Sequence, residues 1–298
     1  MSQQLHNDEI PTATTALRRA ISGQHPKFAG LPLELTASHG TQNRIWRLGD
    51  DHLVRVPRQI STIPALEKEA EWLPRLGPKL PLPLPKVVAM GHADQHVALP
   101  WLITNWQTGA DFASVGHTDL SATAAELAGF IKALQSLDVP PDAPKGSRGR
   151  PLAPQTDRFT AALLELSTDG FAQTDAVRNL WEKGLEAGDW VGDPVWLHGD
   201  LMPGNLLHDN NRLSGVIDWG CLSTGDPAYD LTPAWFLFQP ADRNRFLEAL
   251  GPSSAQIERA RARVAWQAVV ALPYYKDRNP PLLAQMKRGL AEVLRSQT

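Results

Sequence analysis

Short stretches of alternating hydrophobic and polar residues dominate the first third of the chain, which is the pattern of strands with one buried face. The strands expected are 33–36, 44–48, 52–56, 86–90 and 97–105, and helix-spaced apolar positions add helices at 12–22 and 61–76. Two turn-like segments, 38–43 and 49–51, separate the first three strands. The pattern predicts an antiparallel sheet with one main helix at 61–76.

Beyond residue 106 the pattern changes to long segments with apolar residues at helical spacing. The helices expected are 119–137, 155–167, 173–187, 227–238, 241–250, 253–272 and 280–296, and the short strands are 195–198, 206–208 and 213–217. The segment 139–154 is rich in Pro, Gly, Lys and Arg and is expected to be a surface loop. The fold class is therefore α+β, with a sheet lobe at 1–106 and a larger, mostly helical lobe at 107–298.

Composition narrows the partners of this chain. It has 298 residues, of which 42% are hydrophobic and 20% charged, as in ordinary globular proteins. A net charge of -3 gives no general attraction to nucleic acid or to a membrane surface. The N-terminal ten residues lack the apolar segment of a signal peptide, and the single cysteine, Cys221, permits no intrachain disulfide. We expect a cytoplasmic protein.

The strongest chemical signal is two carboxylates and a carboxamide close together. Asp200 and Asn205 are five positions apart across a loop, and Asp218 follows an apolar strand. Asp200 is suited to accept the proton of a substrate hydroxyl, while the oxygens of Asn205 and Asp218 are ligands that Mg²⁺ prefers. Each residue alone would read as a turn former or strand cap. All three in this order instead indicate phosphoryl transfer from a Mg²⁺-bound nucleotide, as in the protein-kinase catalytic loop.

The neighbouring polar residues are assigned supporting roles. His198 is expected to pack and hydrogen-bond under the loop that carries Asp200, rather than to transfer a proton. Asp226 and Asp230 are expected to brace the same loop. Trp235 and Trp266 lie on expected helices, where packing between helices is favoured over contact with a substrate.

Three segments together resemble the aminoglycoside phosphotransferase family, a small-molecule branch of the protein-kinase-like fold. They are 198–205 (HGDLMPGN), 217–220 (IDWG) and 225–231 (GDPAYDL). The resemblance implies a two-lobed kinase-like fold in which 1–106 binds the nucleotide and ends in the hinge, and 107–298 holds the catalytic residues and the acceptor.

The resemblance also implies a nucleotide site in the first lobe. Gly40, Thr41 and Asn43 would form a phosphate-contacting turn, although a plain hairpin turn explains this segment equally well. Arg55 takes the place of the lysine that protein kinases carry on the third strand, and an arginine can grip phosphate bidentately. Glu69 is its best partner, because it shares the inward helix face; Glu67 and Glu71 are alternatives.

The hinge of the family corresponds to Asn105 and Trp106, whose backbone would meet the nucleotide base. The expected reaction moves the γ-phosphoryl group of ATP or GTP, with Mg²⁺, to a hydroxyl of an aminoglycoside or macrolide antibiotic. Two alternatives stay open: a small-metabolite kinase acting on an amino alcohol or sugar, and a catalytically silent nucleotide-binding protein. The acceptor, the choice of nucleotide and the oligomeric state do not follow from the sequence.

Overall fold

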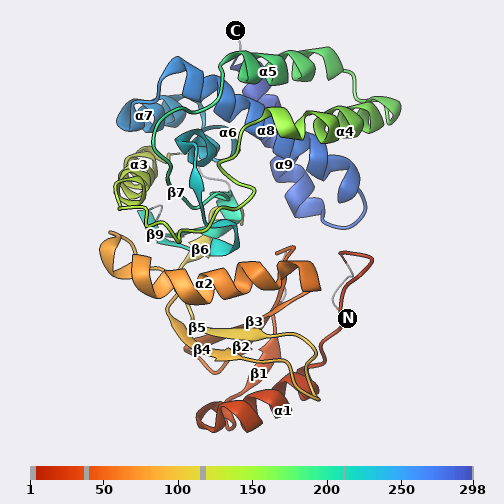
Figure 1. The fold of residues 1–298 in the computed structure, drawn as a ribbon, viewed down its shortest axis with the longest axis vertical. Coiled ribbons are helices and arrows are strands. Elements are labelled where there is room, and N and C mark those ends of the chain that lie inside the picture. Colours follow the sequence, from red (N-terminus) through yellow and green to blue (C-terminus); the bar gives the residue numbers. More distant parts are fainter. Residues whose placement is uncertain (1–4, 37–39, 115–118, 211, 297–298) are drawn as a thin grey trace. The chain divides into compact units, whose positions relative to one another are not determined.

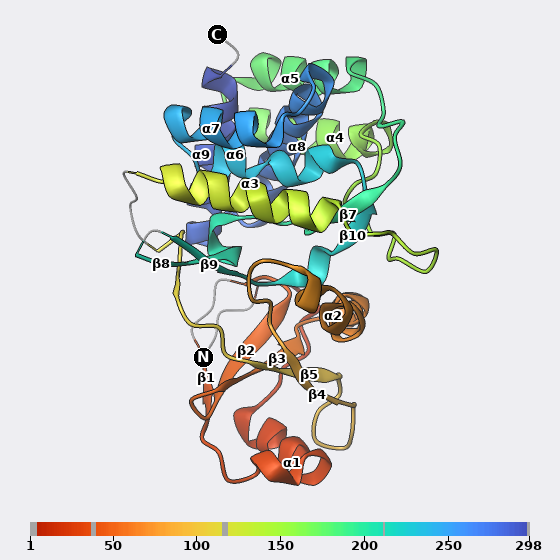
Figure 2. The same ribbon diagram turned by 90° about the vertical axis from the view of Figure 1, so that its left-hand side faces the viewer.

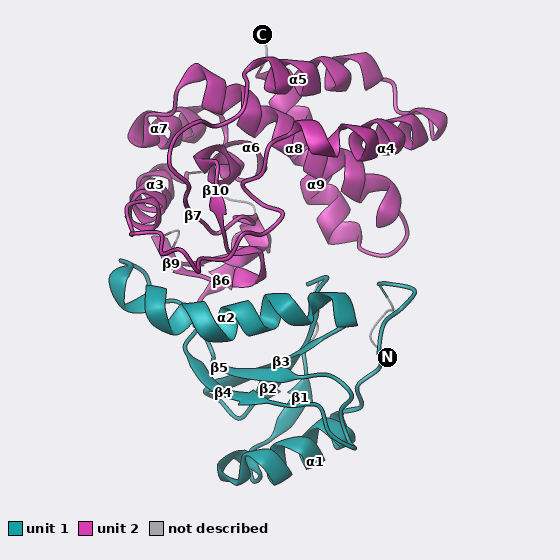
Figure 3. Cartoon of the chain, viewed as in Figure 1, with its two compact units in different colours: residues 1–108 teal, residues 109–298 magenta. Residues whose placement is uncertain are grey.

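The computed structural model describes residues 5–36, 40–114, 119–210 and 212–296. The chain divides into two compact units, residues 1–108 and 109–298, which are coloured separately in Figure 3. Unit 1 contains the sheet lobe expected from the alternating pattern, and unit 2 is mostly helical.

Unit 1 is built on one five-stranded antiparallel sheet with the order β1-β2-β3-β5-β4. Its strands are β1 (Leu33–Leu35), β2 (Asn43–Leu48), β3 (His52–Pro57), β4 (Val87–Gly91) and β5 (Trp101–Asn105). Its α-helices are α1 (Thr14–Gln24) and α2 (Ile63–Leu76). Figure 1 shows α1 and α2 on opposite sides of this sheet.

The two faces of the sheet follow the period of two along β3. Val54 and Val56 are fully buried in a core that includes Leu17 and Ile21 of α1. Arg55, between them, therefore points to the other face, where α2 lies. Because of this alternation, the Arg55 side chain faces α2, the helix that carries Glu69.

One strand of unit 1 is shorter than the sequence pattern predicts. The apolar run 97–105 is strand only from Trp101, because Pro100 has no backbone N–H to give a sheet. The preceding residues form a turn in which Asp94 Oδ1 accepts hydrogen bonds from the backbone of His96 and Val97. Val97 is nevertheless buried, so its hydrophobicity reflects burial and not strand structure.

Unit 2 packs its helices around a long central helix. The helices are α3 (Ser121–Gln135), α4 (Thr156–Thr168), α5 (Thr174–Glu186), α6 (Pro233–Phe236), α7 (Pro240–Leu250), α8 (Ser254–Tyr274) and α9 (Pro280–Arg295). The strands are β6 (Ala110–Asp111), β7 (Val195–Leu197), β8 (Leu206–Asp209), β9 (Arg212–Val216) and β10 (Ser223–Gly225). Helix α8 contacts α4, α5 and α9, while α3 lies against α7, as Figure 2 also shows.

Three features of unit 2 differ from the sequence prediction, and one is the short strand β6, which was not expected and pairs with β8. The helix expected at 227–238 is a 3₁₀ turn, Pro227–Leu231, followed by the short α6, because Pro233 supplies no N–H to continue the first turn. The strand β10 was not expected either; it pairs antiparallel with β7, the strand that ends just before residues 198–205. Among the described residues, no helix is long and apolar enough to cross a membrane.

Candidate active site

The loop 198–205, here called the catalytic loop, joins β7 to β8 and is ordered by contacts within itself. The Asp200 carbonyl accepts hydrogen bonds from the backbone of Met202 (2.7 Å) and from Asn205 Nδ2 (2.9 Å). Asn205 Nδ2 also lies 3.2 Å from Asp200 Oδ2. The five-residue spacing therefore brings the carboxamide directly to the carboxylate, as the sequence motif predicts.

Asp218 completes the group of polar residues at this loop. Its backbone is left-handed, with φ 61° and ψ 69°, a conformation that costs a non-glycine residue free energy. Burial raises the pKa of Asp200, Arg148 counteracts this, and the negative charge of Asp218 raises it further, so the two carboxylates sense one another. A strained backbone that holds two carboxylates in mutual repulsion is typical of a functional site.

His198 lies beneath the catalytic loop with both ring nitrogens occupied. Nδ1 accepts a hydrogen bond from the Asp200 backbone N–H (3.2 Å), so Nε2 carries the proton and donates to the Ile217 carbonyl (3.1 Å). The residue is fully buried, and burial lowers its pKa to about 3. The imidazole is thus hydrogen-bonded at both ring nitrogens beneath the loop, the position in which the sequence places a supporting residue.

Asp230 supports the start of the same loop. Its two carboxylate oxygens accept hydrogen bonds from the backbone of His198 and Gly199, each at 2.8 Å. Burial raises the pKa of Asp230 to about 7, although the two backbone donors act against this shift. The residue is fully buried, so its function is to hold the loop backbone and not to contact a substrate.

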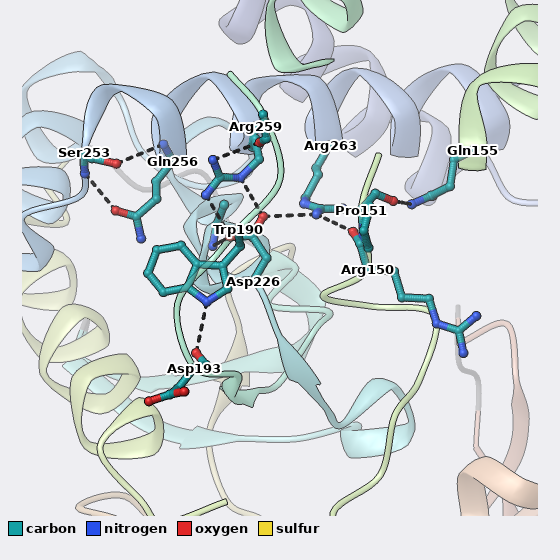
Figure 4. Close-up of polar contacts among 12 residues, drawn as sticks. Arg150, Pro151, Gln155, Trp190, Asp193, Asp226, Ser253, Gln256, Arg259 and Arg263 are labelled. Atoms are coloured by element: carbon teal, nitrogen blue, oxygen red, sulfur yellow. Dashed lines mark hydrogen bonds and ion pairs between the residues drawn. The ribbon is translucent and has the colours of Figure 1, made fainter. Parts of the chain in front are cut away.

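Asp226 serves a different purpose from Asp230. It binds Arg259 (2.8 Å) and Arg263 (3.3 Å) of α8, and it caps the following turn through the Ala228 N–H (3.0 Å). Figure 4 shows the two arginines reaching this carboxylate from one helix. Asp226 therefore fixes the segment after Asp218 to the central helix of unit 2.

Arg148 is the residue of this site that the sequence argument missed. It lies in the segment expected to be a plain surface loop, yet its Nη2 is 3.9 Å from Asp200 Oδ1. The side chain is 20% exposed, and its guanidinium is hydrogen-bonded to Cys221. Burial raises the pKa of the Cys221 thiol, and Arg148 acts against this shift. No motif around Arg148 distinguishes it from the other basic residues of that loop.

In unit 1, Arg55 and Glu69 form a buried bidentate pair. Nη1 lies 3.0 Å from Oε1 and Nη2 2.6 Å from Oε2, and both side chains are almost fully buried. Glu69 is the partner that helical spacing favours. Glu71 instead pairs with Arg75 at the surface. The guanidinium of Arg55 is thus held rigidly at one position on the α2 face of the sheet.

Arg58, the residue after the end of β3, forms an ion pair with Glu9, which was not predicted from the sequence. Glu9 binds Arg58 Nη1 (3.1 Å) and Arg44 Nη2 (2.9 Å). Burial works to raise the pKa of Glu9, but hydrogen bonds from Arg44 and from the Leu5 backbone outweigh it and lower the pKa. The segment before α1 therefore neutralises two cations of the sheet.

The remaining residues predicted for nucleotide binding lie at or next to the ends of strands β2 and β5. Gly40 and Thr41 precede β2, and the Thr41 carbonyl is 2.9 Å from His6 Nε2. Asn43 starts β2 opposite Pro57 and is buried, and its Oδ1 has no hydrogen-bond partner among the described residues. Residues 38 and 39 of the predicted turn lie outside the described residues.

The predicted hinge is tied to the sheet through its own polar groups. Asn105 Oδ1 accepts hydrogen bonds from the Lys86 backbone (2.6 Å) and from Gln107 Nε2 (3.1 Å). The Trp106 N–H donates to the Asp51 carbonyl (2.7 Å), and Arg47 stacks on the indole at 3.9 Å. The Trp106 N–H is therefore engaged within the sheet lobe.

The two tryptophans considered for the acceptor pocket differ. Trp235 is buried, and its Nε1 donates to Ser296 Oγ (3.0 Å), so it packs between helices as expected. Trp266 is only partly buried, and Arg158 lies 5.6 Å from its ring centroid.

The donor set fits Mg²⁺ in the presence of a nucleotide. Among the described residues, no group of three or more His, Cys, Asp or Glu side chains gathers to hold a metal. The carboxylate of Asp218 and the carboxamide of Asn205 are instead a sparse oxygen set typical of Mg²⁺, which takes its other ligands from water and substrate phosphates. Both described hydrogen bonds of the Asn205 side chain use its nitrogen, which leaves the oxygen as the atom for a cation.

Comparison with solved structures identifies the fold. The GDP complex of wild-type aminoglycoside 2'-phosphotransferase-IIIa superposes with a TM-score of 0.73 at 18% identity, covering 96% of this chain and 100% of that chain. Macrolide 2'-phosphotransferase type I gives 0.64 at 23% identity, covering 95% and 98%. The chain has the kinase-like fold of these antibiotic kinases.

Sequence relatives cover less of the chain. Hygromycin-B 4-O-kinase of Escherichia coli is 25% identical over 195 residues, which are 61% of this chain and 57% of that protein. The Uncharacterized protein YcbJ of Bacillus subtilis (strain 168) is 32% identical over 83 residues, 26% of this chain and 27% of that protein. The chain thus spans less than two thirds of the length of either relative.

A family model covers nearly the whole fold. It matches residues 35–287, a range that includes the buried Arg55–Glu69 pair of the sheet lobe as well as the catalytic loop and Asp218. The match extends well beyond the short motifs and includes both units. On this ground the chain belongs to the phosphotransferase enzyme family.

Proposed function

We propose that this enzyme transfers the γ-phosphoryl group of ATP or GTP to a hydroxyl of an aminoglycoside or macrolide antibiotic. The observation that carries the proposal is the ordered catalytic loop, in which Asp200 is held by Asn205 and by the buried supports His198 and Asp230. The antibiotic acceptor is supported by the names of the relatives: a hygromycin-B 4-O-kinase, and structures with kanamycin, streptomycin or gentamicin.

The residues of each lobe have distinct roles in this proposal. Residues 1–106 bind the nucleotide: the turn at Gly40, Thr41 and Asn43 and the Arg55 guanidinium, which Glu69 holds, contact the phosphates, and the hinge at Asn105–Trp106 meets the base. Residues 107–298 hold the acceptor. GDP and ADP complexes of the structural neighbours support a nucleotide donor. A cytoplasmic location, where ATP and GTP are available, agrees with this reaction.

Asp200 accepts a hydrogen bond from the acceptor hydroxyl, orients it and takes its proton. Asn205 and Asp218 would hold Mg²⁺, which when bound supplies positive charge to the nucleotide phosphates. Because phosphoryl transfer requires little covalent work from the protein, positioning and charge stabilisation provide most of the rate. The Arg55–Glu69 pair is rigid before any nucleotide binds, so no side-chain ordering is needed there.

A coupled assay of nucleoside diphosphate release tests this proposal. ATP and GTP are each supplied with kanamycin, gentamicin, streptomycin, hygromycin B, a macrolide, an amino alcohol and a sugar. Turnover with an antibiotic supports the proposal, and turnover with only the last two assigns a metabolite kinase. Asp200→Ala should keep nucleotide affinity and abolish transfer; nucleotide binding by wild type with no turnover on any acceptor would indicate a silent protein.

Growth of a host that expresses the wild-type or the Asp200→Ala protein on graded antibiotic tests the same reaction in cells. Resistance conferred by the wild type alone identifies the acceptor class. Calorimetry with Mg²⁺ and nucleotide tests the metal assignment separately: Asp218→Ala should weaken Mg²⁺-nucleotide binding, and unchanged affinity would remove Asp218 from the metal site.

A further inference from the structure

The segment 144–150, here called the arginine loop, is fixed to the strand that follows Asp218. Its Pro144 carbonyl accepts a hydrogen bond from the Thr224 N–H (3.0 Å), and its Gly149 carbonyl from the Asp226 N–H (3.0 Å). Ser223 Oγ donates to the Arg148 carbonyl at 3.0 Å. A loop with this many backbone contacts holds its side chains at defined positions.

Helix α8 adds a further contact to the arginine loop. Arg263 Nη2 donates to the Arg150 carbonyl at 2.7 Å and also reaches Asp226, as Figure 4 shows. The arginine loop is thereby connected to the same carboxylate that fixes the segment after Asp218. The Arg150 side chain itself extends away from Arg263 in that view and is exposed.

The contact between the loop and the sheet is too close for a side chain at one position. Gly149 has φ +77°, and a Cβ there would lie 2.6 Å from Leu197 Cδ1 and 3.0 Å from the Gly225 Cα. Glycine is required for both reasons. The neighbouring Arg148 then lies over Gly199, where a Cβ would be 2.9 Å from Arg148 Cγ.

The geometry of Arg148 differs from that of the structural ion pairs of this protein. Arg55–Glu69 closes to 2.6 Å and Arg259–Asp226 to 2.8 Å, whereas Arg148 Nη2 stays 3.9 Å from Asp200 Oδ1. That distance is too long for a hydrogen bond. Arg148 Nε is buried and has no hydrogen-bond partner among the described residues. The cation is near the carboxylate without being bound to it.

The reaction requires the transferring group at this place. An acceptor oxygen must lie about 2.6–3.2 Å from Asp200 to give up its proton, and the phosphorus about 3–3.5 Å from that oxygen. A guanidinium 3.9 Å from the Asp200 carboxylate is therefore within reach of the phosphoryl oxygens. An arginine is also the side chain best shaped to contact two oxygens of one phosphoryl group.

We propose that Arg148 is a catalytic residue that binds the equatorial oxygens of the γ-phosphoryl group during its transfer. This role rests on the proposed function. In the step, the acceptor oxygen forms a bond to phosphorus while the bond from phosphorus to the β–γ bridging oxygen breaks. The hydroxyl proton goes to Asp200, and the nucleoside diphosphate leaves with the bonding electron pair. Arg148 neutralises charge on the phosphoryl group throughout.

Steady-state kinetics of Arg148→Ala beside Arg150→Ala test this role. Both variants lose one positive charge from the same loop, but the Arg150 carbonyl that Arg263 binds is retained. We expect kcat of Arg148→Ala to fall about 10²–10³-fold, the loss typical of removing one transition-state donor. The nucleotide KM should change by less than about threefold, since contacts made only in the transition state leave ground-state binding intact. Arg150→Ala should match the wild type.

Two measurements separate catalysis from structure. Free guanidinium at low millimolar concentration should restore part of the kcat of Arg148→Ala, and Arg148→Lys should retain more activity than Arg148→Ala. A loss that guanidinium leaves unchanged, or one that follows a lowered unfolding temperature, would overturn the role. So would a kcat equal to that of Arg150→Ala.

The turnover of the wild-type enzyme, measured in the same assay, separates failure of the proposed function from failure of the role of Arg148. If the wild type turns over no acceptor, the proposed function fails, and the role of Arg148 falls with it. If the wild type turns over an acceptor and Arg148→Ala equals Arg150→Ala, only the role of Arg148 fails.

Discussion

The catalytic loop carries Asp200, and the arginine loop reaches Asp200 from a distant part of the chain; the two loops are held in opposite ways. The catalytic loop is held by side chains: His198 and Asp230, both buried, accept hydrogen bonds from backbone N–H groups of the loop. In the arginine loop, backbone carbonyls accept hydrogen bonds from Ser223, Thr224 and other donors elsewhere. The catalytic loop therefore depends on particular side chains at particular positions. The arginine loop depends mostly on the course of its own backbone.

This difference explains why one loop has a sequence motif and the other does not. A carboxylate or imidazole that supports a backbone is visible in the sequence, whereas a carbonyl is present at every position. In the arginine loop the path itself restricts two glycines: Gly149 through its positive φ and close contacts, and Gly146, where a Cβ would lie 3.1 Å from Ser223 Cβ. The comparison teaches that a catalytic cation can be delivered by a segment whose composition indicates nothing more than a surface loop.

Removing the carboxylate beneath the catalytic loop should have the largest effect on stability. Asp230→Ala leaves the buried N–H groups of His198 and Gly199 without acceptors. At roughly 1–3 kcal/mol for each group, we expect the free energy of unfolding to fall by about 4 kcal/mol. Urea denaturation measures this. Asp94→Ala is the matched control, because Asp94 also accepts two backbone N–H groups but is exposed; equal losses in the two variants would contradict the argument.

A side chain at Gly149, which would force the backbone of the arginine loop to shift, should have the next largest effect on stability. Gly149→Ala combines a positive φ with a Cβ 2.6 Å from Leu197, and we expect a loss of about 3 kcal/mol. Gly170→Ala isolates the backbone strain, because Gly170 has φ +90° and open space around it; about 1 kcal/mol is expected there. Thermal unfolding compares the two. If Gly149→Ala kept the wild-type kcat, Arg148 would not depend on this path.

Titration of His198 should produce a smaller effect that depends on pH. Its pKa is about 3 in the folded protein and 6.5 in the unfolded chain, so between these values the unfolded chain binds the extra proton. Stability from this residue is complete above pH 6.5 and is lost as the pH falls. From pH 6.5 to 5 the loss is about 2 kcal/mol.

The variant His198→Asn isolates this effect, because asparagine can accept the Asp200 N–H without titrating. The difference between the wild type and this variant in the free energy of unfolding should shrink toward pH 5. The raised pKa of Asp230 acts with the opposite sign, but it is common to both proteins and cancels in the difference. Parallel pH curves for the two proteins would show that His198 does not titrate between the folded and unfolded states.

The smallest effect is expected from one donor to the arginine loop. Ser223→Ala removes the hydrogen bond to the Arg148 carbonyl and leaves the other backbone contacts of the loop in place. We expect a loss of about 1 kcal/mol in the free energy of unfolding and little change in kcat. A fall in kcat as large as that of Arg148→Ala would mean that this one bond places the guanidinium.

Much of the fold follows from local patterns in the sequence. The five strands of unit 1 and the long helices of unit 2 are predicted to within a few residues, since each has a regular period and clear ends. The failures have physical causes: in the run 97–100, Val97 and Leu99 are buried although they lie outside the sheet, and 227–238 is interrupted by Pro233. β10 was missed because three residues with Ser, Thr and Gly carry no strand signal.

The candidate site is predictable where residues close in the chain determine it. Asp200 and Asn205 are five residues apart; the family resemblance points to Arg55, and helical spacing favours Glu69 as its partner. Arg148 is 52 positions before Asp200, and only the tertiary structure brings them together. The pairing of Arg58 with Glu9 is likewise long-range, 49 positions apart.

The Arg58–Glu9 pair affects where a shortened version of this protein can begin. The family match begins at residue 35, yet Glu9 and the core residues Leu17 and Ile21 come before it. A fragment trimmed to the matched range would leave Arg44 and Arg58 as buried charges without their carboxylate, and would uncover one face of the sheet. Such a fragment should be insoluble, although it retains every motif by which the family is recognised.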